Sequence, residues 1–219
     1  MSLITAILAK NEQDNHLAEV LTRCGEFSDQ ILLLDDSSTD GTRDLAKRLG
    51  ATVRSRKTEV VAWGTEAPAR AELWDWMAKE AKDGWGLICD ADMILHGDPL
   101  PYTKAWDCNA WAFILYDLWQ DRNTYRSDTF WQGHTHPRPW LFRPSAVPSD
   151  YQPQWPDRGL HTGHCPLNFP IVAGLATDLA WYHLAYLTPE QRKKKHLSYM
   201  ARKDQLTPAE VAHAESIIE

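Results

Sequence analysis

The 219-residue chain is long enough for one domain with a full hydrophobic core, because 43% of its residues are apolar. Its formal net charge of −7 argues against a surface built mainly to neutralise nucleic-acid phosphates. No run reaches the roughly 18 apolar residues of a membrane span, and MSLITAILAKNEQ lacks the features of a signal peptide, so we expect a cytoplasmic location. The four cysteines are widely spaced, which favours reduced thiols over a disulfide framework.

Strand-like and helix-like segments alternate along the first hundred residues. Short apolar runs predict strands at 3–9, 30–36, 51–55 and 85–90. Amphipathic segments between them predict helices at 16–25, 42–50 and 67–82, two of which close on a glycine. This alternation predicts an α/β fold with a mostly parallel sheet and crossover helices.

The second half lacks this regular alternation. It contains most of the eleven tryptophans and many prolines, so we expect irregular loops and short strands there. A buried core position is the default expectation for any single tryptophan. Near the C-terminus, TPEQ at 188–191 is a capping box with proline at the first helical position, which predicts a helix through the basic run RKKKH.

Three of the predicted strands end in acids or amides, in the segments LAKNE, LLLDD and LICDAD. A buried parallel strand cannot hold an unpaired carboxylate in its middle, so these side chains must lie at the sheet edge where open α/β sheets bind ligands. Asp90 and Asp92 alternate along an extended backbone, which places both on one face with Ala91 between them. Two such oxygen donors suit Mg²⁺ or Mn²⁺ held against a diphosphate.

Four motifs in this order, AKNE, LLLDDSSTDGT, PARAELWDWM and CDADM, resemble the family 2 glycosyltransferases of the GT-A fold. The resemblance covers Leu3 to about Leu100 and implies a GT-A-like, Rossmann-like α/β fold. It implies an enzyme that moves a sugar from a nucleoside diphosphate sugar to a hydroxyl acceptor, with Mn²⁺ or Mg²⁺ and with inversion. We expect one domain over 1–219, with a nucleotide-sugar half at 1–100 and an acceptor half with C-terminal helices at 101–219.

The resemblance also implies the residues of the donor site. Asp36 would accept a hydrogen bond from the base, Arg70 would lie near the diphosphate, and Asp92 would bind the metal directly. The alternative for Asp36 and Asp40 is a turn and a helix cap, for which Asp40 and Ser38 would suffice, and the alternative for Arg70 is a solvated helix charge. The full nucleotide-sugar set is Ala9, Asn11, Glu12, Asp36, Arg70, Asp90, Ala91 and Asp92.

A second metal ligand is expected from the distant segment LAWYHLAYLTPEQRKKKHLSYM, which resembles the C-terminal signature of the family. His183 matches the histidine of that signature. The alternative is a core histidine packed among Trp181, Tyr182 and Tyr186. The RKKKH run would close over the diphosphate, reach anionic lipid at a membrane surface, or be solvated.

The general base and the acceptor are harder to predict. The fragment DRNTYRSDTFWQ resembles a region of small family members and makes Asp128 the candidate base, in competition with Asp121, Asp150 and Asp157. The acceptor would be a glycan, a lipid-linked glycan or another hydroxyl compound, with nucleic acid the least expected. Two rival functions are nucleotidyl transfer, for which a glycine-rich phosphate loop is missing, and a non-catalytic zinc module built from His134, His136, His161, His164 and Cys165.

Overall fold

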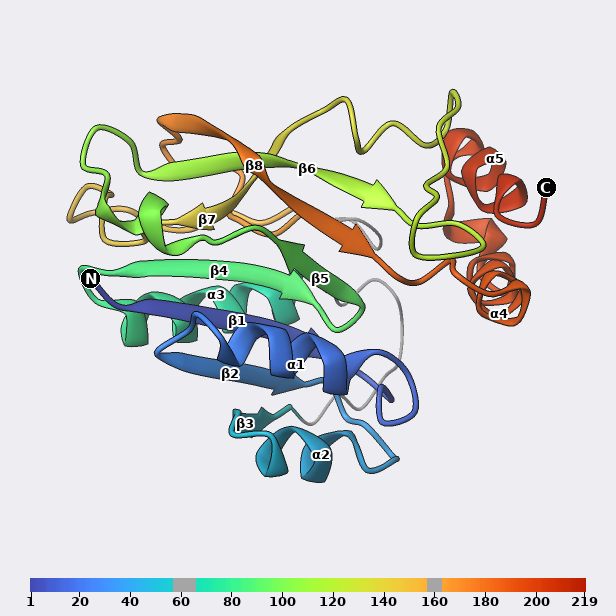
Figure 1. Cartoon of the computed structure of the whole chain (residues 1–219), viewed down its shortest axis with the longest axis horizontal. Helices are drawn as coiled ribbons and strands as arrows, with labels where there is room; N and C mark the ends of the chain where they lie inside the picture. The colour runs from blue at the N-terminus through green and yellow to red at the C-terminus, as the bar shows by residue number, and fades with distance from the viewer. Residues whose placement is uncertain (57–65, 157–162) are drawn as a thin grey trace.

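The computed structural model describes residues 1–56, 66–156 and 163–219, and its strands form one eight-stranded sheet in the order β3-β2-β1-β4-β7-β6-β8-β5 (Figure 1). The first half of the chain supplies a parallel part, in which β1 pairs with β2 and β4, and β2 pairs with β3. The four predicted strands are confirmed, as β1 (Leu3–Ala9), β2 (Gln30–Asp35), β3 (Thr52–Ser55) and β4 (Trp85–Asp90).

The helices between these strands cover both faces of the parallel part. They are α1 (Leu17–Gly25), α2 (Thr42–Arg48) and α3 (Glu66–Ala81), close to the predicted ranges. Figure 1 shows α1 and α3 on opposite faces of β1 and β4. β1, β2 and β4 bury side chains on both faces: in β1, Ile7 packs in the cluster that includes Leu21 of α1, and Ile4 in the cluster that includes Met77 of α3. The near-continuous apolar runs of these strands reflect this double burial.

The second half of the sheet is mixed, and the expected loops and short strands, such as β5 and β7, are accompanied by two longer strands that the sequence did not predict. β7 lies antiparallel to both β4 and β6, while β8 is parallel to β6 and antiparallel to β5. Register shifts next to Ala112 interrupt the two-residue period on which strand prediction depends. The elements are β5 (Met93–His96), a 3₁₀ helix η2 (Leu100–Lys104), β6 (Ala110–Asp117), β7 (Arg138–Phe142) and the 11-residue β8 (Ala173–His183).

The C-terminal helices lie beyond the ends of β6 and β8 (Figure 1). The predicted capping box is confirmed: Thr188 Oγ1 accepts from Gln191 N at 3.2 Å, and Gln191 Oε1 accepts from Thr188 N at 3.0 Å. An aromatic cluster that includes Trp131, Tyr186 and Tyr199 anchors these helices. They are α4 (Pro189–Met200), the 3₁₀ helix η3 (Lys203–Gln205) and α5 (Pro208–Ser216).

Two further sequence expectations concern the whole chain. All four cysteines are free thiols, as expected, and Cys24, Cys89 and Cys108 are buried. The packed sheet is therefore held together without a disulfide.

Within residues 1–56, 66–156 and 163–219, no helix is long and apolar enough to cross a membrane.

Candidate active site

The parallel strands β1, β2 and β4 end at the same edge of the sheet, and the loops after β1 and β2 are joined there by hydrogen bonds. Asn11 Oδ1 accepts from Thr39 N at 2.8 Å, and Asn11 N donates to Ser38 Oγ at 2.9 Å. Asn11 has a φ of 56°, a left-handed conformation that asparagine tolerates better than most residues. Ser38 therefore joins the two loops and is not the helix cap that the sequence suggested.

Asp36 lies at this edge between two cations. Its carboxylate is 3.6 Å from Lys10 Nζ and 3.0 Å from Arg56 Nη1. The neighbouring Asp35 is fully buried and accepts from the backbone N–H of Ser38, so it forms the turn. The Oδ1 atom of Asp40 accepts from the backbone N–H at the start of α2, where Gly41 is the N-cap residue. Asp35 and Asp40 thus supply the carboxylate acceptors of the turn and of the start of α2.

Asp90 is held by an arginine from α3. Arg70 Nη2 donates to Asp90 Oδ1 at 2.6 Å, and Arg70 Nε donates to Glu66 Oε1 at 3.0 Å. Because Arg70 is only 5% exposed, its interpretation as a solvated helix charge is wrong. Burial by itself raises the pKa of Asp90, but the charges of Arg70 and His164, with the contacts that both make to its carboxylate, together outweigh it and hold this pKa well below the ordinary value.

Asp92 faces a different set of groups, because β4 ends at Asp90 and the chain turns at residues 91–92. The expectation that Asp90 and Asp92 share one face of an extended strand is therefore wrong. Asp92 Oδ2 lies 3.5 Å from His183 Nε2 and 4.0 Å from Lys195 Nζ of α4. Asp92 Oδ1 is buried and has no hydrogen-bond partner in the described part of the chain.

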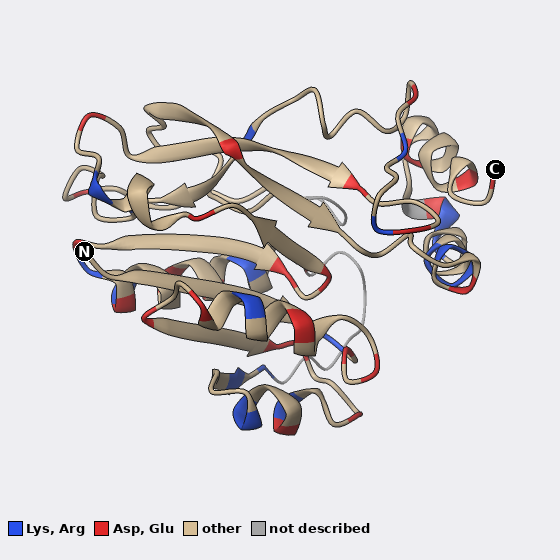
Figure 2. Cartoon of the chain, in the orientation of Figure 1, with Lys and Arg blue, Asp and Glu red and all other residues tan. Residues whose placement is uncertain are grey.

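Strand pairing explains how His183 returns to Asp92 across ninety residues of sequence. β8 places His183 beside Met93 of β5 on one side and beside Asp117 of β6 on the other. His183 Nδ1 lies 2.7 Å from Asp117 Oδ1, so this carboxylate orients the ring with Nε2 toward Asp92. Figure 2 shows acidic positions at the ends of β4 and β6, on the side of the molecule where the basic helix α4 lies.

The charges in this group change the protonation of its members. Burial by itself lowers the pKa of His183, but the charges of Asp92 and Asp117 outweigh it and raise this pKa to about 10. Burial and the charge of Asp92 raise the pKa of Glu12 to about 7. Burial alone would lower the pKa of Lys195, whereas Asp92 raises it. Protonated His183 and Lys195 therefore balance the negative charges of Asp92 and Asp117.

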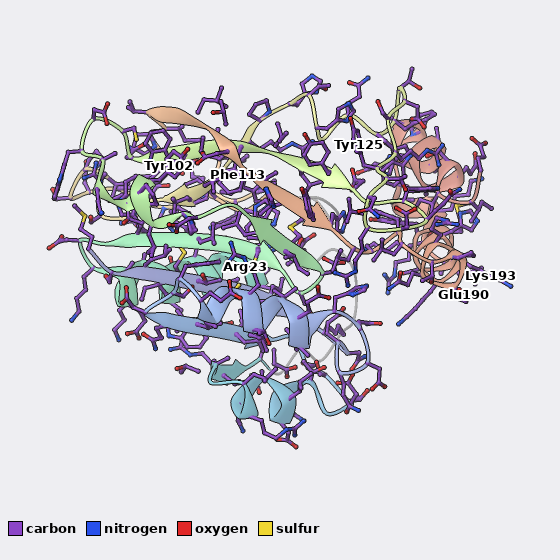
Figure 3. All side chains as sticks on the ribbon, viewed as in Figure 1. Arg23, Tyr102, Phe113, Tyr125, Glu190 and Lys193 are labelled. Atoms are coloured by element: carbon purple, nitrogen blue, oxygen red, sulfur yellow. The ribbon has the colours of Figure 1, made fainter. Side chains whose placement is uncertain are left out.

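Sequence reasoning missed three members of the site. Asp117 ends β6 as the other acids end their strands, and that signal was available in the segment AFILYD. Lys195 belongs to the predicted RKKKH helix; Glu190 and Lys193 of the same helix are exposed on its outer side (Figure 3). His164, considered for zinc, instead has Nε2 3.4 Å from Asp90 Oδ2. No local pattern in the sequence predicts that contact.

The candidate base Asp128 lies in a turn near the C-terminal helices. Its carboxylate accepts from Arg126 Nε at 2.6 Å and from Phe130 N at 2.8 Å. Burial alone would raise the pKa of Asp128, but the hydrogen bond and charge of Arg126, together with the backbone N–H groups of Phe130 and Trp131, outweigh it and lower this pKa. Of its competitors, Asp121 accepts backbone hydrogen bonds in its own turn, Asp150 is exposed, and Asp157 lies outside the described residues.

The histidines of the zinc alternative are engaged separately. His134 Nε2 lies 3.2 Å from Ser127 Oγ, and His136 Nδ1 lies 2.8 Å from Thr135 Oγ1. His161 lies outside the described residues. No group of three or more His, Cys, Asp or Glu side chains in residues 1–56, 66–156 and 163–219 could hold a metal ion unaided. A zinc module therefore has no support from the described residues.

A parallel sheet with a carboxylate-lined edge, completed by returning antiparallel strands, defines an α/β protein of the GT-A type. The sequence model described as "Glycosyl transferase family 2" matches residues 5–159. The chain therefore belongs to this family, as the four motifs predicted.

Solved structures similar to this chain include the following three. Glucosyl-3-phosphoglycerate synthase from Mycobacterium tuberculosis with Mn²⁺, UDP and glucosyl-3-phosphoglycerate is 23% identical, with a TM-score of 0.39 over 52% of this chain and 44% of that chain. The same synthase with Mn²⁺ and UDP-glucose is 20% identical (TM-score 0.38, 52% and 43%). A mycobacterial protein is 21% identical (TM-score 0.38, 52% and 40%). This chain thus spans less than half the length of each, and no curated protein matches it.

The residues present fit the divalent cation that the family implies. Asp92 Oδ1 is a buried carboxylate oxygen without a hydrogen-bond partner among the described residues, and an oxygen of this kind is the ligand that Mg²⁺ and Mn²⁺ prefer. His183 Nε2 approaches the other oxygen of the same carboxylate. If these two side chains held a cation, positions would stay open for phosphate oxygens, which is how Mg²⁺ is usually held in nucleotide sites.

Proposed function

We propose that this protein is a glycosyltransferase that moves a sugar from a nucleoside diphosphate sugar to a hydroxyl acceptor with inversion, using Mn²⁺ or Mg²⁺. The observation that carries the proposal is the meeting of Asp92 with the Asp117-oriented His183 at the carboxyl edge of a family 2 sheet. A histidine that only packs in the core does not require contacts with two carboxylates. Burial of Asp92 Oδ1 without a hydrogen-bond partner among the described residues would cost free energy unless a ligand bound this oxygen.

Each site residue receives a role in this proposal. Asp92 and His183 hold the metal, and the bound cation would stabilise negative charge that develops on the leaving diphosphate. Asp117 keeps His183 Nε2 directed at the metal position. Lys195 Nζ lies 4.0 Å from Asp92 Oδ2. Once a bound cation neutralises Asp92, the ammonium group of Lys195 can pair with a phosphate oxygen instead.

The wall formed by the loops after β1 and β2 would bind the nucleoside. Asp36 accepts from the base, while Asn11 and Glu12 line the base and ribose pocket together with the backbone at Ala9. Arg70 fixes Asp90 for a contact with the ribose or with a metal-bound water, and Ala91 leaves room between the two acids. The contacts that hold Asn11 and Arg70 support this arrangement, since preorganised groups lose little freedom when a ligand binds.

Inversion requires a base on the sugar face opposite the leaving group. Asp128 stays the candidate for this role, and its ion pair with Arg126 must then open when the acceptor binds. If Asp128 is the base, Asp128→Asn should lower kcat by about 10²-fold or more with little change in donor affinity.

The second half of the chain would supply the acceptor side, and the continuous sheet supports one domain over 1–219.

A donor screen tests the proposed function directly. The purified protein is given each common nucleotide sugar with Mn²⁺, and release of nucleoside diphosphate is followed with and without EDTA. We expect hydrolysis of one donor class, lost on chelation and in Asp92→Asn. Absence of metal-dependent turnover and of nucleotide binding for every donor would contradict the proposal.

A further inference from the structure

Two buried polar atoms on either side of Asp90 lack a hydrogen-bond partner in the described part of the chain: Arg70 Nη1 and His164 Nε2. Arg70 uses its other two nitrogens on Glu66 and Asp90 and is 5% exposed. Buried polar atoms are nearly always satisfied, by protein, water or ligand. Their position beside Asp90 therefore indicates a place where a polar ligand group binds.

His164 reaches this place from a segment far from the DxD turn. Its ring packs against Trp140 of β7, with ring centroids 4.5 Å apart, and only 16% of the side chain is exposed. Nε2 lies 3.4 Å from Asp90 Oδ2, a contact longer than an ordinary hydrogen bond. Burial and the charge of Arg70 lower the pKa of His164, which favours a neutral ring at pH 7.

The chemistry of Asp90 and His164 determines which ligand group can bind between them. A hydroxyl can donate to the carboxylate oxygen of Asp90 and at the same time accept from the N–H of a neutral imidazole. A phosphate oxygen only accepts: Arg70 Nη1 and His164 Nε2 could donate to it, but its negative charge would face Asp90 Oδ2 without a proton between the two oxygens. A hydroxyl placed between His164 Nε2 and Asp90 Oδ2 satisfies both of these atoms.

We propose that His164 is a further donor-binding residue, which together with Asp90 holds a hydroxyl of the nucleotide sugar. This rests on the proposed function, because it requires that a nucleotide sugar binds at the carboxyl edge. The hydroxyl belongs to the ribose or to the transferred sugar, and both present the same chemistry to Nε2.

Calorimetry in the presence of Mn²⁺ tests the proposal on the full chain. The tightest binder among UDP, GDP, ADP and CDP is compared with its 2′-deoxy and 3′-deoxy forms and with its glucose and N-acetylglucosamine conjugates. His164→Phe keeps the ring packing on Trp140 and removes the N–H. His164→Gln keeps a donor near the Nε2 position, and His134→Phe is the matched control, because His134 contacts Ser127 away from Asp90.

We expect His164→Phe to weaken binding about tenfold, the usual effect of one hydrogen bond, with part of the loss restored in His164→Gln and none seen in His134→Phe. If the partner is a ribose hydroxyl, the loss disappears for the deoxy form that lacks it. If it is a sugar hydroxyl, the loss appears with a conjugate and not with the free diphosphate.

Equal affinities of wild type and His164→Phe for every ligand would overturn the inference. So would an equal loss with the diphosphate, both deoxy forms and the conjugates, since that pattern marks His164 as a packing residue only. Should His164→Phe fail to fold, the same comparison is made with His164→Gln and His164→Leu. If the wild-type protein binds no nucleoside diphosphate at all, the proposed glycosyltransferase function is contradicted. Failure of that function is thereby distinguished from failure of the role proposed for His164.

Discussion

The strands within residues 3–90 and those within residues 93–183 belong to one sheet, but they bring side chains to the site in different ways. In the first half, parallel strands joined by helices all end at one edge, so each strand delivers its acid through local sequence alone. In the second half, β8 returns antiparallel to β5, and its register decides which residue meets Asp92. The proposed nucleoside wall thus comes from a local rule, and the proposed metal pair comes from long-range pairing.

Because the two halves contribute different groups, substitutions in each half should have different effects on nucleotide binding. Residues of the first half that touch only the nucleoside should change nucleotide affinity whether or not a metal is present. Residues at the junction of the halves should change the metal dependence. Five substitutions, from the largest expected effect to the smallest, test this separation.

Asp92 lies at the junction and should have the largest effect. Because Asp92→Asn removes the only charged oxygen ligand we assign, activity should fall by about 10³-fold, corresponding to several kcal/mol of lost charge stabilisation. Mn²⁺-dependent affinity for the nucleoside diphosphate should fall with it in calorimetry. Asp44→Asn, at an exposed position of α2, is the control. Unchanged Mn²⁺ dependence would remove Asp92 from the metal site.

His183 should come next, with a loss of about 10²-fold in His183→Asn and a changed pH dependence. The pKa of His183 is raised to about 10, so Mn²⁺ must displace a proton at neutral pH. Affinity for Mn²⁺ in the nucleotide complex should therefore rise about tenfold per pH unit below this pKa, and the variant should lose that slope. A wild-type affinity that does not vary between pH 6 and 9 would argue against the role.

The same pKa makes a separate prediction for the metal-free protein. A raised pKa stabilises the fold when the proton is bound, so this contribution is complete below the ordinary histidine pKa of about 6.5 and is lost as pH rises through about 10. Thermal unfolding in EDTA should show a falling Tm over that window in wild type and a flatter profile in His183→Asn. Parallel profiles would contradict the ion pair.

Asp117 acts on the metal only through His183, so its effect should be smaller. Asp117→Asn should weaken Mn²⁺ affinity by about 10- to 100-fold, the usual consequence of losing a carboxylate behind a histidine ligand. Asp178→Asn is the matched control, because Asp178 lies on β8, the strand that carries His183, but contacts Tyr102. In the His183→Asn background, Asp117→Asn should add little; a full additional loss would mean that Asp117 acts independently.

Asp36 tests the other side of the comparison. Asp36→Ala should weaken nucleotide binding by about 1–3 kcal/mol, and by the same amount with Mn²⁺ or with EDTA, because its contact is with the base. Titration of the nucleoside diphosphate under both conditions measures this. A loss confined to the Mn²⁺ condition would place Asp36 with the metal group, against the division between the halves.

Lys195 should show the smallest effect. Lys195→Met should weaken diphosphate binding by about fivefold, the contribution of a partly exposed charge at about 1 kcal/mol. Lys193→Met is the matched control on the same helix, because Lys193 points outward (Figure 3). Equal losses in both variants would show that α4 acts through its general positive charge.

Sequence alone was sufficient for the first half of the fold and for most of the acidic edge. Buried parallel strands give continuous apolar runs that end where their polar residues begin, and each helix has its own start and stop signals, so β1 to β4 and α1 to α3 were predicted close to their observed bounds. The same reasoning located Asp36, Asp90 and Asp92 at one edge.

Tertiary structure decided which groups these acids meet. The bulged strands β6 and β8 lack a clean period of two, and a one-residue shift in their register would turn Asp117 and His183 to the other face of the sheet. The contacts of Asp90 with Arg70 and His164 join a strand, a helix and a loop that are distant in the chain. Local patterns carry no information about such contacts, since they depend on packing and pairing across the whole sheet.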